Sequence, residues 1–234
     1  MSQVVPATHR PAGAALESAA KLRRIVPEAV LVGGSAAALL ADDRASPDHG
    51  HVVADLAARF DAILEAVETT DGWVASRVSP GKVVLGELGG IETGVRQLIR
   101  TVPLEATVVE LPTDAHVRVP APDEILQVKG HLIVGRDETR DNLDLVALAD
   151  RCGVERSAPA LAPIDDGYRD QQVPKTKGVA TQLVRQLADP RPRDGRTTTQ
   201  LDRYKGLDAR RAGWVEVVTA CKHLALQIAR TKRG

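Results

Sequence analysis

The stretch Ala29-Val30-Leu31-Val32-Gly33-Gly34-Ser35 decides the fold of the first part of this 234-residue chain. Its four apolar residues predict a short buried strand, and the two glycines predict a tight turn at the end of that strand. Ser35 is a good N-cap residue for a helix over 36–41. Glycines let the backbone approach a ligand closely, and a helix start offers N–H groups to phosphate. Capping alone also accounts for these residues, because strand-to-helix turns favour Gly and Ser in general.

Outward from this junction, the hydrophobic patterns predict a mixed first half and a helical second half. Helical spacing covers 14–26 and 56–67, whereas short apolar runs predict strands at 51–53, 73–78, 83–88, 105–111 and 117–119. After Pro120 the patterns predict helices over 123–134, 138–151, 176–188 and 209–231. The sequence therefore predicts an α+β protein. A mixed sheet with flanking helices is expected in residues 1–120, and a helical domain that is basic towards the C-terminus is expected in residues 121–234.

The amino-acid composition excludes several classes of protein. Lys+Arg and Asp+Glu both number 31, but residues 168–234 hold 15 Lys/Arg against 6 Asp/Glu, which favours a polyanion partner. No apolar run approaches the roughly 20 residues that a membrane helix needs, and the first residues lack the apolar stretch of a secretory signal. Two cysteines cannot build a disulfide scaffold. We therefore expect a cytoplasmic protein without a membrane partner.

A second motif follows the glycine turn closely: Arg44-Ala45-Ser46-Pro47-Asp48-His49-Gly50-His51. A Gly-Ser turn, a helix, and Arg-x-Ser-x-Asp before an apolar strand resemble the entry to the nucleotidyltransferase fold. The resemblance is closest to the AbiEii/MenT-type toxin nucleotidyltransferases of bacterial toxin–antitoxin systems, and it runs from about Val30 to Gly153. In that family the turn holds the triphosphate of an NTP, and an Asp-x-Asp pair holds magnesium. The resemblance implies Asp48 as the ligand of Mg²⁺ or Mn²⁺. It also implies nucleotide-binding roles for Gly34, Ser35, Arg44 and Ser46.

The chain departs from this pattern at the second metal position, which is Gly50. Glycine supplies no ligand, so the enzyme is expected to be impaired unless another acid reaches the metal. Glu105 and Glu110 are the candidates for a third carboxylate from a later strand. His49 and His51 alternate with Asp48, so a strand points them to the opposite face, and the three side chains cannot converge on zinc.

A further motif lies beyond Pro120. Lys129, followed by Thr139-Arg140-Asp141-Asn142-Leu143-Asp144-Leu145, resembles the downstream lysine and the Arg-Asp-x-x-Asp-Leu helix of the same family. The resemblance implies that Lys129 and Arg140 bind nucleotide phosphates and that Asp144 positions or deprotonates the attacking hydroxyl. The residues alone leave another interpretation open. Asp137, Asp141 and Asp144 share one helical face, which is typical of a solvated, salt-bridged surface.

The resemblance implies a Mg²⁺-dependent, monomeric enzyme that moves a nucleotide from an NTP to an RNA acceptor. That acceptor is expected to be the 3′ end of tRNA, so that aminoacylation and translation are blocked until a cognate antitoxin intervenes. The C-terminal cations suit an RNA backbone, and three aromatic residues are candidates for stacking on a base: Tyr168, Tyr204 and Trp214. The alternatives are a catalytically weakened or inactive protein that binds nucleotide, RNA or a partner, a transferase acting on a small molecule such as an aminoglycoside, and one acting on a protein.

Overall fold

The computed structural model describes residues 5–6, 13–42, 44–169 and 178–232. Its contacts divide the chain into two compact units. Unit 1 comprises residues 1–39, 46–99 and 105–121, and unit 2 comprises residues 40–45, 100–104 and 122–234. The main division falls after residue 121, next to the boundary predicted after residue 120. In addition, the segments 40–45 and 100–104 group with the helical unit.

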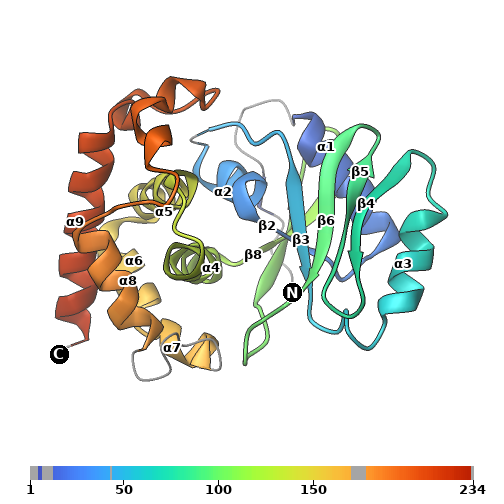
Figure 1. Ribbon diagram of the computed structural model, residues 1–234, viewed down its shortest axis with the longest axis horizontal. Coiled ribbons are helices and arrows are strands. Elements are labelled where there is room, and N and C mark those ends of the chain that lie inside the picture. The colour runs from blue at the N-terminus through green and yellow to red at the C-terminus, as the bar shows by residue number, and fades with distance from the viewer. Residues whose placement is uncertain (1–4, 7–12, 43, 170–177, 233–234) are drawn as a thin grey trace. The chain divides into compact units, whose positions relative to one another are not determined.

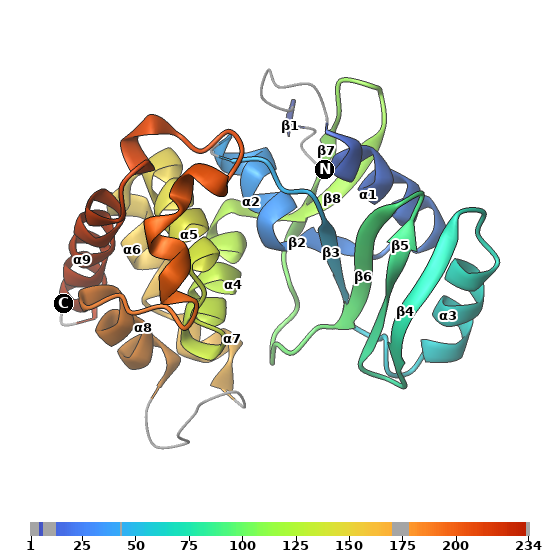
Figure 2. The ribbon, with the colours of Figure 1, turned by 45° about the horizontal axis from the view of Figure 1, so that its top comes forward.

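Unit 1 is built on a five-stranded mixed sheet (Figure 1). Its strands, in spatial order, are β2 (Val30–Val32), β3 (His49–Val53), β6 (Ile91–Gln97), β5 (Val83–Leu88) and β4 (Trp73–Ser79). β3 runs parallel to β6, and the other neighbours are antiparallel. A smaller sheet has the order β1 (Val5–Pro6), β7 (Ala106–Glu110) and β8 (His116–Pro120). β8 also contacts β2 and α1 (Ala14–Ile25), as Figure 2 shows.

The core of unit 1 lies between one face of the large sheet and two helices, α1 and α3 (Phe60–Glu68). Leu22 from α1, Ile63 from α3 and Val95 from β6 are all buried in this core. Alternation along each strand sends the next side chains to the other face of the sheet. That face carries charged side chains such as the exposed Glu87 and Glu92.

Unit 2 is a bundle of helices. They are α4 (Pro122–Gly135), α5 (Thr139–Cys152), α6 (Val154–Leu161), α7 (Ile164–Gly167), α8 (Val179–Ala188) and α9 (Trp214–Thr231). α4 packs against α5, α6 and α8, whereas α9 packs against α5, α6 and α8. Three short 3₁₀ turns, η2 (Gly195–Thr199), η3 (Leu201–Arg203) and η4 (Ala209–Arg211), lie between α8 and α9. Buried Leu126, Leu143, Leu183 and Leu224 contribute to the interior of the bundle.

The structure confirms the α+β class, with a mixed sheet followed by helices. It corrects several boundaries. The segment 55–59 forms turns ahead of α3, and 209–213 precedes α9 instead of opening it. Of the helix predicted over 176–188, residues 176–177 lie outside the described residues, and α8 covers Val179–Ala188. β6 and α6 were not predicted. Within the described residues, no helix is both long and apolar enough to cross a membrane.

Candidate functional site

The Gly-Ser turn joins β2 directly to α2 (Gly33–Ala41). Gly33 has a φ of +77°, a backbone conformation that favours glycine, so the chain can turn sharply there. Because α2 already begins at Gly33, Ser35 lies in its first turn and is not the predicted N-cap. Instead, the buried Ser35 hydroxyl donates a hydrogen bond to the carbonyl oxygen of Asp48. This contact ties the start of α2 to the entry of β3.

Asp48 is partly exposed and immediately precedes β3. The Ser46 hydroxyl donates to its carboxylate Oδ1 at 2.9 Å and lies 3.3 Å from its carbonyl oxygen. Ser46 is therefore placed to orient the Asp48 side chain. Ser35 of the glycine turn and Ser46 and Asp48 of the motif that follows it are thus linked by hydrogen bonds within unit 1.

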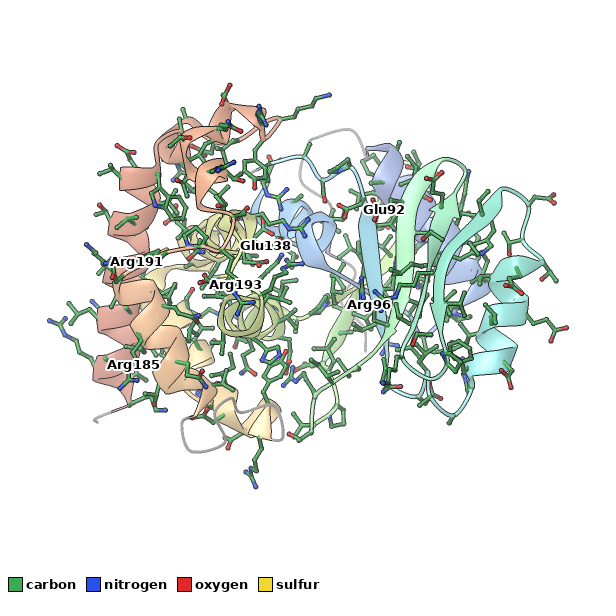
Figure 3. All side chains as sticks on the ribbon, viewed as in Figure 1. Glu92, Arg96, Glu138, Arg185, Arg191 and Arg193 are labelled. Atoms are coloured by element: carbon green, nitrogen blue, oxygen red, sulfur yellow. The ribbon has the colours of Figure 1, made fainter. Side chains whose placement is uncertain are left out.

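A carboxylate that sequence reasoning missed lies on the neighbouring strand. In the parallel pair β3–β6, His49 is opposite Thr93 and Gly50 is opposite Gly94. Asp48 and Glu92 each come one residue before the first pair of this ladder. Glu92 is opposite the acid Glu87 of β5 (Figure 3 labels Glu92).

The two acids proposed from the sequence lie elsewhere. Glu110 belongs to β7 of the smaller sheet, where it is opposite His116. Glu105 precedes that strand, and its carbonyl oxygen accepts a hydrogen bond from the Ala121 N–H. The signal that could have found Glu92 is the strand register, because a parallel partner of β3 carries its side chains on the face that Asp48 uses.

The acids near the start of β3 and β6 offer few ligands to a divalent cation. Among the described residues, no group of three or more His, Cys, Asp or Glu side chains is arranged to hold a metal. Mg²⁺, however, is often held by only one or two carboxylates together with substrate phosphates and water. Like charges directly opposite each other across strands repel, and a bound cation would relieve that repulsion. The partly exposed Asp48 carboxylate therefore fits Mg²⁺ bound together with a nucleotide, but not a site made of protein ligands alone.

Gly50 and its partner Gly94 differ sharply in the space around them. A Cβ atom at Gly50 would meet nothing within 4 Å, whereas one at Gly94 would clash with Leu85 Cδ2. Leu85 thus packs over Gly94, and the backbone at Gly50 stays open. A side chain can be introduced at Gly50 without a clash, so the missing second carboxylate has room in this fold.

His49 and His51 lie on the buried face of β3, as predicted from the alternation with Asp48. His49 Nδ1 is 2.9 Å from the Thr93 hydroxyl, and the two imidazole rings meet edge to face with their centres 5.2 Å apart. Burial lowers the pKa of His49 to about 4, although the nearby Asp48 opposes this shift. Burial also lowers the pKa of His51 well below its ordinary value. Both rings are therefore neutral parts of the interior at pH 7.

Lys129 and Asp144 of the motif beyond Pro120 form an ion cluster with Arg44 inside unit 2. The Asp144 carboxylate accepts hydrogen bonds from Arg44 Nε at 2.8 Å, from Arg44 Nη2 at 3.1 Å and from Lys129 Nζ at 2.5 Å. All three side chains are at most 5% exposed. The two cations share one carboxylate. Asp144 therefore positions both of them.

The remaining acids of this motif do not form a solvated stripe, and that alternative interpretation is wrong. Asp137 lies outside α5 and has a φ of +54°. Asp141 is fully buried and pairs with Arg136, at 2.9 Å from Nε and 2.5 Å from Nη2. Arg140 bonds Glu138 at 2.6 Å and is 40% exposed. Glu138 therefore holds Arg140 at the surface. Asp144 accepts hydrogen bonds from Arg44 and Lys129 instead.

Comparison with known proteins places similar sequences inside much longer chains. No family model matches this chain. It is 32% identical over 222 residues to the heme uptake protein MmpL11 of Mycobacterium tuberculosis, which is 90% of this chain and 22% of MmpL11. It is 37% identical over 124 residues to the mycolic acid-containing lipids exporter MmpL11 of Mycolicibacterium smegmatis, covering 53% of this chain and 12% of that protein. The chain thus spans about a fifth or less of these curated relatives.

One solved structure shows a distant likeness. It is the crystal structure of an antigenic nucleotidyltransferase-like protein from Paracoccidioides brasiliensis, which matches with a TM-score of 0.40 and 16% identity. The match covers 56% of this chain and 72% of that protein.

The three aromatic candidates for base stacking have different surroundings. Tyr168 is 2% exposed, and its ring stacks on His131 with centres 4.0 Å apart. Its faces are therefore not offered to a base, which corrects that prediction. Trp214 opens α9 and is partly buried. Tyr204 is also partly buried, and its ring packs against the Arg44 guanidinium, whose carbon lies 5.3 Å from the ring centre. Burial raises the pKa of Tyr204, so its hydroxyl stays protonated at neutral pH.

Proposed function

We propose that this chain binds an NTP together with Mg²⁺ and transfers the nucleotide to an RNA acceptor, with the 3′ end of tRNA as the expected target. One observation carries the proposal more than any other. The Ser35 hydroxyl of the Gly-Ser turn donates to the carbonyl oxygen of Asp48, and Asp48 precedes β3, the strand that pairs with the strand of Glu92. A phosphate-binding turn and a pair of carboxylates on one sheet face are what a metal–triphosphate complex requires.

The residues of unit 1 take the following roles in this proposal. Asp48 and Glu92 hold the metal, and Ser46 orients the Asp48 carboxylate through its 2.9 Å hydrogen bond. The backbone N–H groups at Gly34 and Ser35 bind phosphate oxygens. When bound, Mg²⁺ would neutralise negative charge on the triphosphate and on the departing pyrophosphate.

In unit 2, Lys129 and Arg44 supply the positive charge for an anionic ligand, and Asp144 holds both in place. A cation that is fixed before the ligand arrives costs no reorganisation during the reaction. We therefore propose that Asp144 acts mainly as a positioning residue. Arg140, which is held by Glu138 at the surface, is proposed to contact nucleotide from that position.

The direct test incubates the protein with Mg²⁺, each labelled NTP in turn and total deacylated tRNA, and measures label in RNA. We expect transfer from at least one NTP, and we expect Asp48→Asn to lower the rate by about 100-fold or more, since even outer-shell changes at metal sites cost 10–100-fold. Glu68→Gln, at an exposed acid on α3, is the matched control and should transfer like the wild type. Wild-type protein that transfers none of the four nucleotides would refute the transferase activity.

Gly50→Asp sharpens this test. A side chain at this position meets nothing within 4 Å, and Asp at Gly50 would lie on the same strand face as Asp48. We expect the substitution to add a metal ligand and to raise the transfer rate. Gly50→Asn, which has the same size without the charge, should leave the rate unchanged.

The toxin role is a finer part of the same proposal. Induced expression should arrest growth and should reduce aminoacylated tRNA, and Asp48→Asn should relieve both effects. A cognate antitoxin should restore growth when it is co-expressed. Growth arrest that persists in Asp48→Asn would show that toxicity does not depend on the proposed site.

A second candidate is a protein of the same fold that binds nucleotide, RNA or a partner without catalysis. Two observations favour it: Gly50 removes one metal ligand, and 90% of the chain matches a part of MmpL11, whose name describes transport. In that case the wild type binds Mg²⁺–NTP in a calorimetric titration but transfers nothing. Transfer gained by Gly50→Asp would then identify a site that is built correctly but lacks one ligand.

A further inference from the structure

The segment from Asp189 to Gly213, here called the strap, connects α8 to α9 and is fastened to unit 2 along its length. The Asp194 carboxylate accepts hydrogen bonds from the Thr139 N–H at 2.7 Å and from the Thr139 hydroxyl at 2.9 Å. Arg211 Nη1 lies 2.5 Å from a carboxylate oxygen of Asp150, further along α5. These contacts lie on the inner side of the strap and hold it in one conformation.

The outer side of the strap and the adjoining turn of α8 are rich in exposed cations. These residues are Arg185, Arg191, Arg193, Arg196, Arg203 and Lys205. Figure 3 labels Arg185 on α8 and Arg191 and Arg193 on the strap that follows it. Arg191 is 82% exposed, although it lies 2.8 Å from Asp189.

The strap holds seven Lys and Arg residues against four Asp residues, and three of these acids have partners. Asp194 bonds Thr139, and Asp208 accepts from Arg210 at 2.8 Å. Asp189 pairs with Arg191, which leaves Asp202 as the remaining acid of the strap. The surface therefore carries a clear excess of positive charge, which is the electrostatic footprint expected for a polyanion.

The polar residues between the cations indicate which polyanion fits. Thr197, Thr198, Thr199 and Gln200 lie among the arginines, and such side chains commonly bond phosphate and sugar oxygens. Among the described residues, the large exposed hydrophobic side chains lie outside the strap, the nearest one being Val215. A helix or segment that binds a membrane surface inserts apolar side chains. The strap therefore suits a nucleic-acid backbone better than a lipid surface.

The strap also leads to the ion cluster. Lys205 accepts a hydrogen bond through its carbonyl oxygen from the Ala45 N–H at 2.8 Å, and the neighbouring Tyr204 packs on Arg44. Arg44 is in turn bonded to Asp144, which also holds Lys129. A backbone that follows the exposed cations would thus reach the cationic residues assigned to the nucleotide.

We propose that the exposed cations of α8 and the strap form the docking track for the RNA acceptor, an inference that rests on the proposed transfer to RNA. The phosphates lie along Arg185, Arg191, Arg193 and Arg196, and the acceptor end lies towards Tyr204. Binding of this kind releases counterions, so its affinity falls steeply with salt.

The test measures binding of fluorescein-labelled deacylated tRNA by anisotropy, without NTP, over a series of salt concentrations. The variant Arg191→Gln/Arg193→Gln/Arg196→Gln should bind at least about tenfold more weakly, and its log–log salt slope should fall by about 2, given about 0.7 per phosphate contact. The matched control is Arg24→Gln/Arg77→Gln/Lys82→Gln, which changes three exposed cations of unit 1. The control should bind like the wild type, and circular dichroism checks that both variants are folded.

Two further arms separate this proposal from its alternatives. Asp48→Asn should bind RNA normally even if Mg²⁺–NTP binding is lost, so a failed docking track and a failed nucleotide site give different results. A DNA of the same sequence and anionic lipid vesicles should bind more weakly than the RNA. The proposal would be overturned if the control triple variant weakened RNA binding as much as the strap variant does, or if the DNA bound as tightly as the RNA or more tightly. It would also be overturned if the strap variant lost vesicle binding while its RNA binding stayed unchanged.

Discussion

The two units differ in the kind of polar side chain that they bury. Unit 1 buries neutral imidazoles, His49 and His51, and keeps the acids Glu87 and Glu92 exposed on the other side of its sheet. Unit 2 buries charged groups in pairs, with Asp144 shared by Arg44 and Lys129. A buried charge is tolerated only while its partner remains, whereas an exposed one adds little to stability. The exposed acids of unit 1 can therefore be changed at small cost, whereas the buried ion cluster of unit 2 cannot.

The chain offers a direct way to measure this difference. It has two tryptophans, Trp73 on β4 of unit 1 and Trp214 on α9 of unit 2. Trp214→Phe leaves a fluorescence reporter in unit 1, and Trp73→Phe leaves one in unit 2. Urea unfolding of these two backgrounds gives a free energy of unfolding for each unit.

The largest expected effect is that of Asp144→Asn. The substitution removes the negative charge shared by Arg44 and Lys129, and breaking a buried ion pair costs about 3–5 kcal/mol. We expect this loss in the free energy of unfolding reported by Trp214. Asp123→Asn, which removes the exposed partner of Arg156, should change it by less than about 1 kcal/mol. An Asp144→Asn protein as stable as the wild type would contradict the comparison.

Acid should destabilise unit 1 through its buried histidines. The folded-state pKa of His49 is about 4, below the unfolded value of 6.5, so the unfolded state binds more protons between these pH values. Stability should therefore fall as the pH drops from about 6.5 towards 4, by up to about 1.4 kcal/mol per pH unit for each histidine. The measurement is urea unfolding followed by Trp73 at several pH values. His49→Gln should flatten this dependence, and a slope that is unchanged by the substitution would show that His49 does not cause it.

A paired glycine experiment probes the open face of unit 1. Gly94→Ala places a methyl group against Leu85, and overpacking of this kind costs about 1–3 kcal/mol. Gly50→Ala, at the opposite position on β3, meets nothing within 4 Å and should be neutral or slightly stabilising. Both are measured by urea unfolding with the Trp73 reporter. Equal destabilisation by the two substitutions would argue against the open space at Gly50.

The smallest stability effect should come from Glu92→Gln. Glu92 is exposed and faces the like charge of Glu87, so its neutralisation should change the free energy of unfolding by less than about 0.5 kcal/mol. The same substitution should weaken Mg²⁺–NTP binding measured by calorimetry. A large loss of stability would indicate that Glu92 is part of the fold, and unchanged binding would remove it from the proposed site.

Much of the fold follows from local patterns. The strand and turn at 29–35 and the strands at 73–78 and 83–88 were predicted close to their observed positions. β6 was missed because Ile91–Gln97 contains Gly94 and charged residues, which weaken the pattern of a strand. Gly94 suits this position because Leu85 of β5 occupies the space that a Cβ atom would fill. Because β6 was not predicted, Glu92, which lies on β6, was not considered as a candidate acid.

The sequence by itself determined the α+β class, the Gly-Ser turn and the kinds of residue that nucleotide chemistry needs. Only the tertiary structure decided which acids lie side by side and which charges are buried together. The physical reason is the distance along the chain. A turn or a helix depends on neighbouring residues, whereas Arg44 meets Asp144 across 100 positions and His49 meets Thr93 across 44. Such contacts form only when packing and strand register bring the segments together.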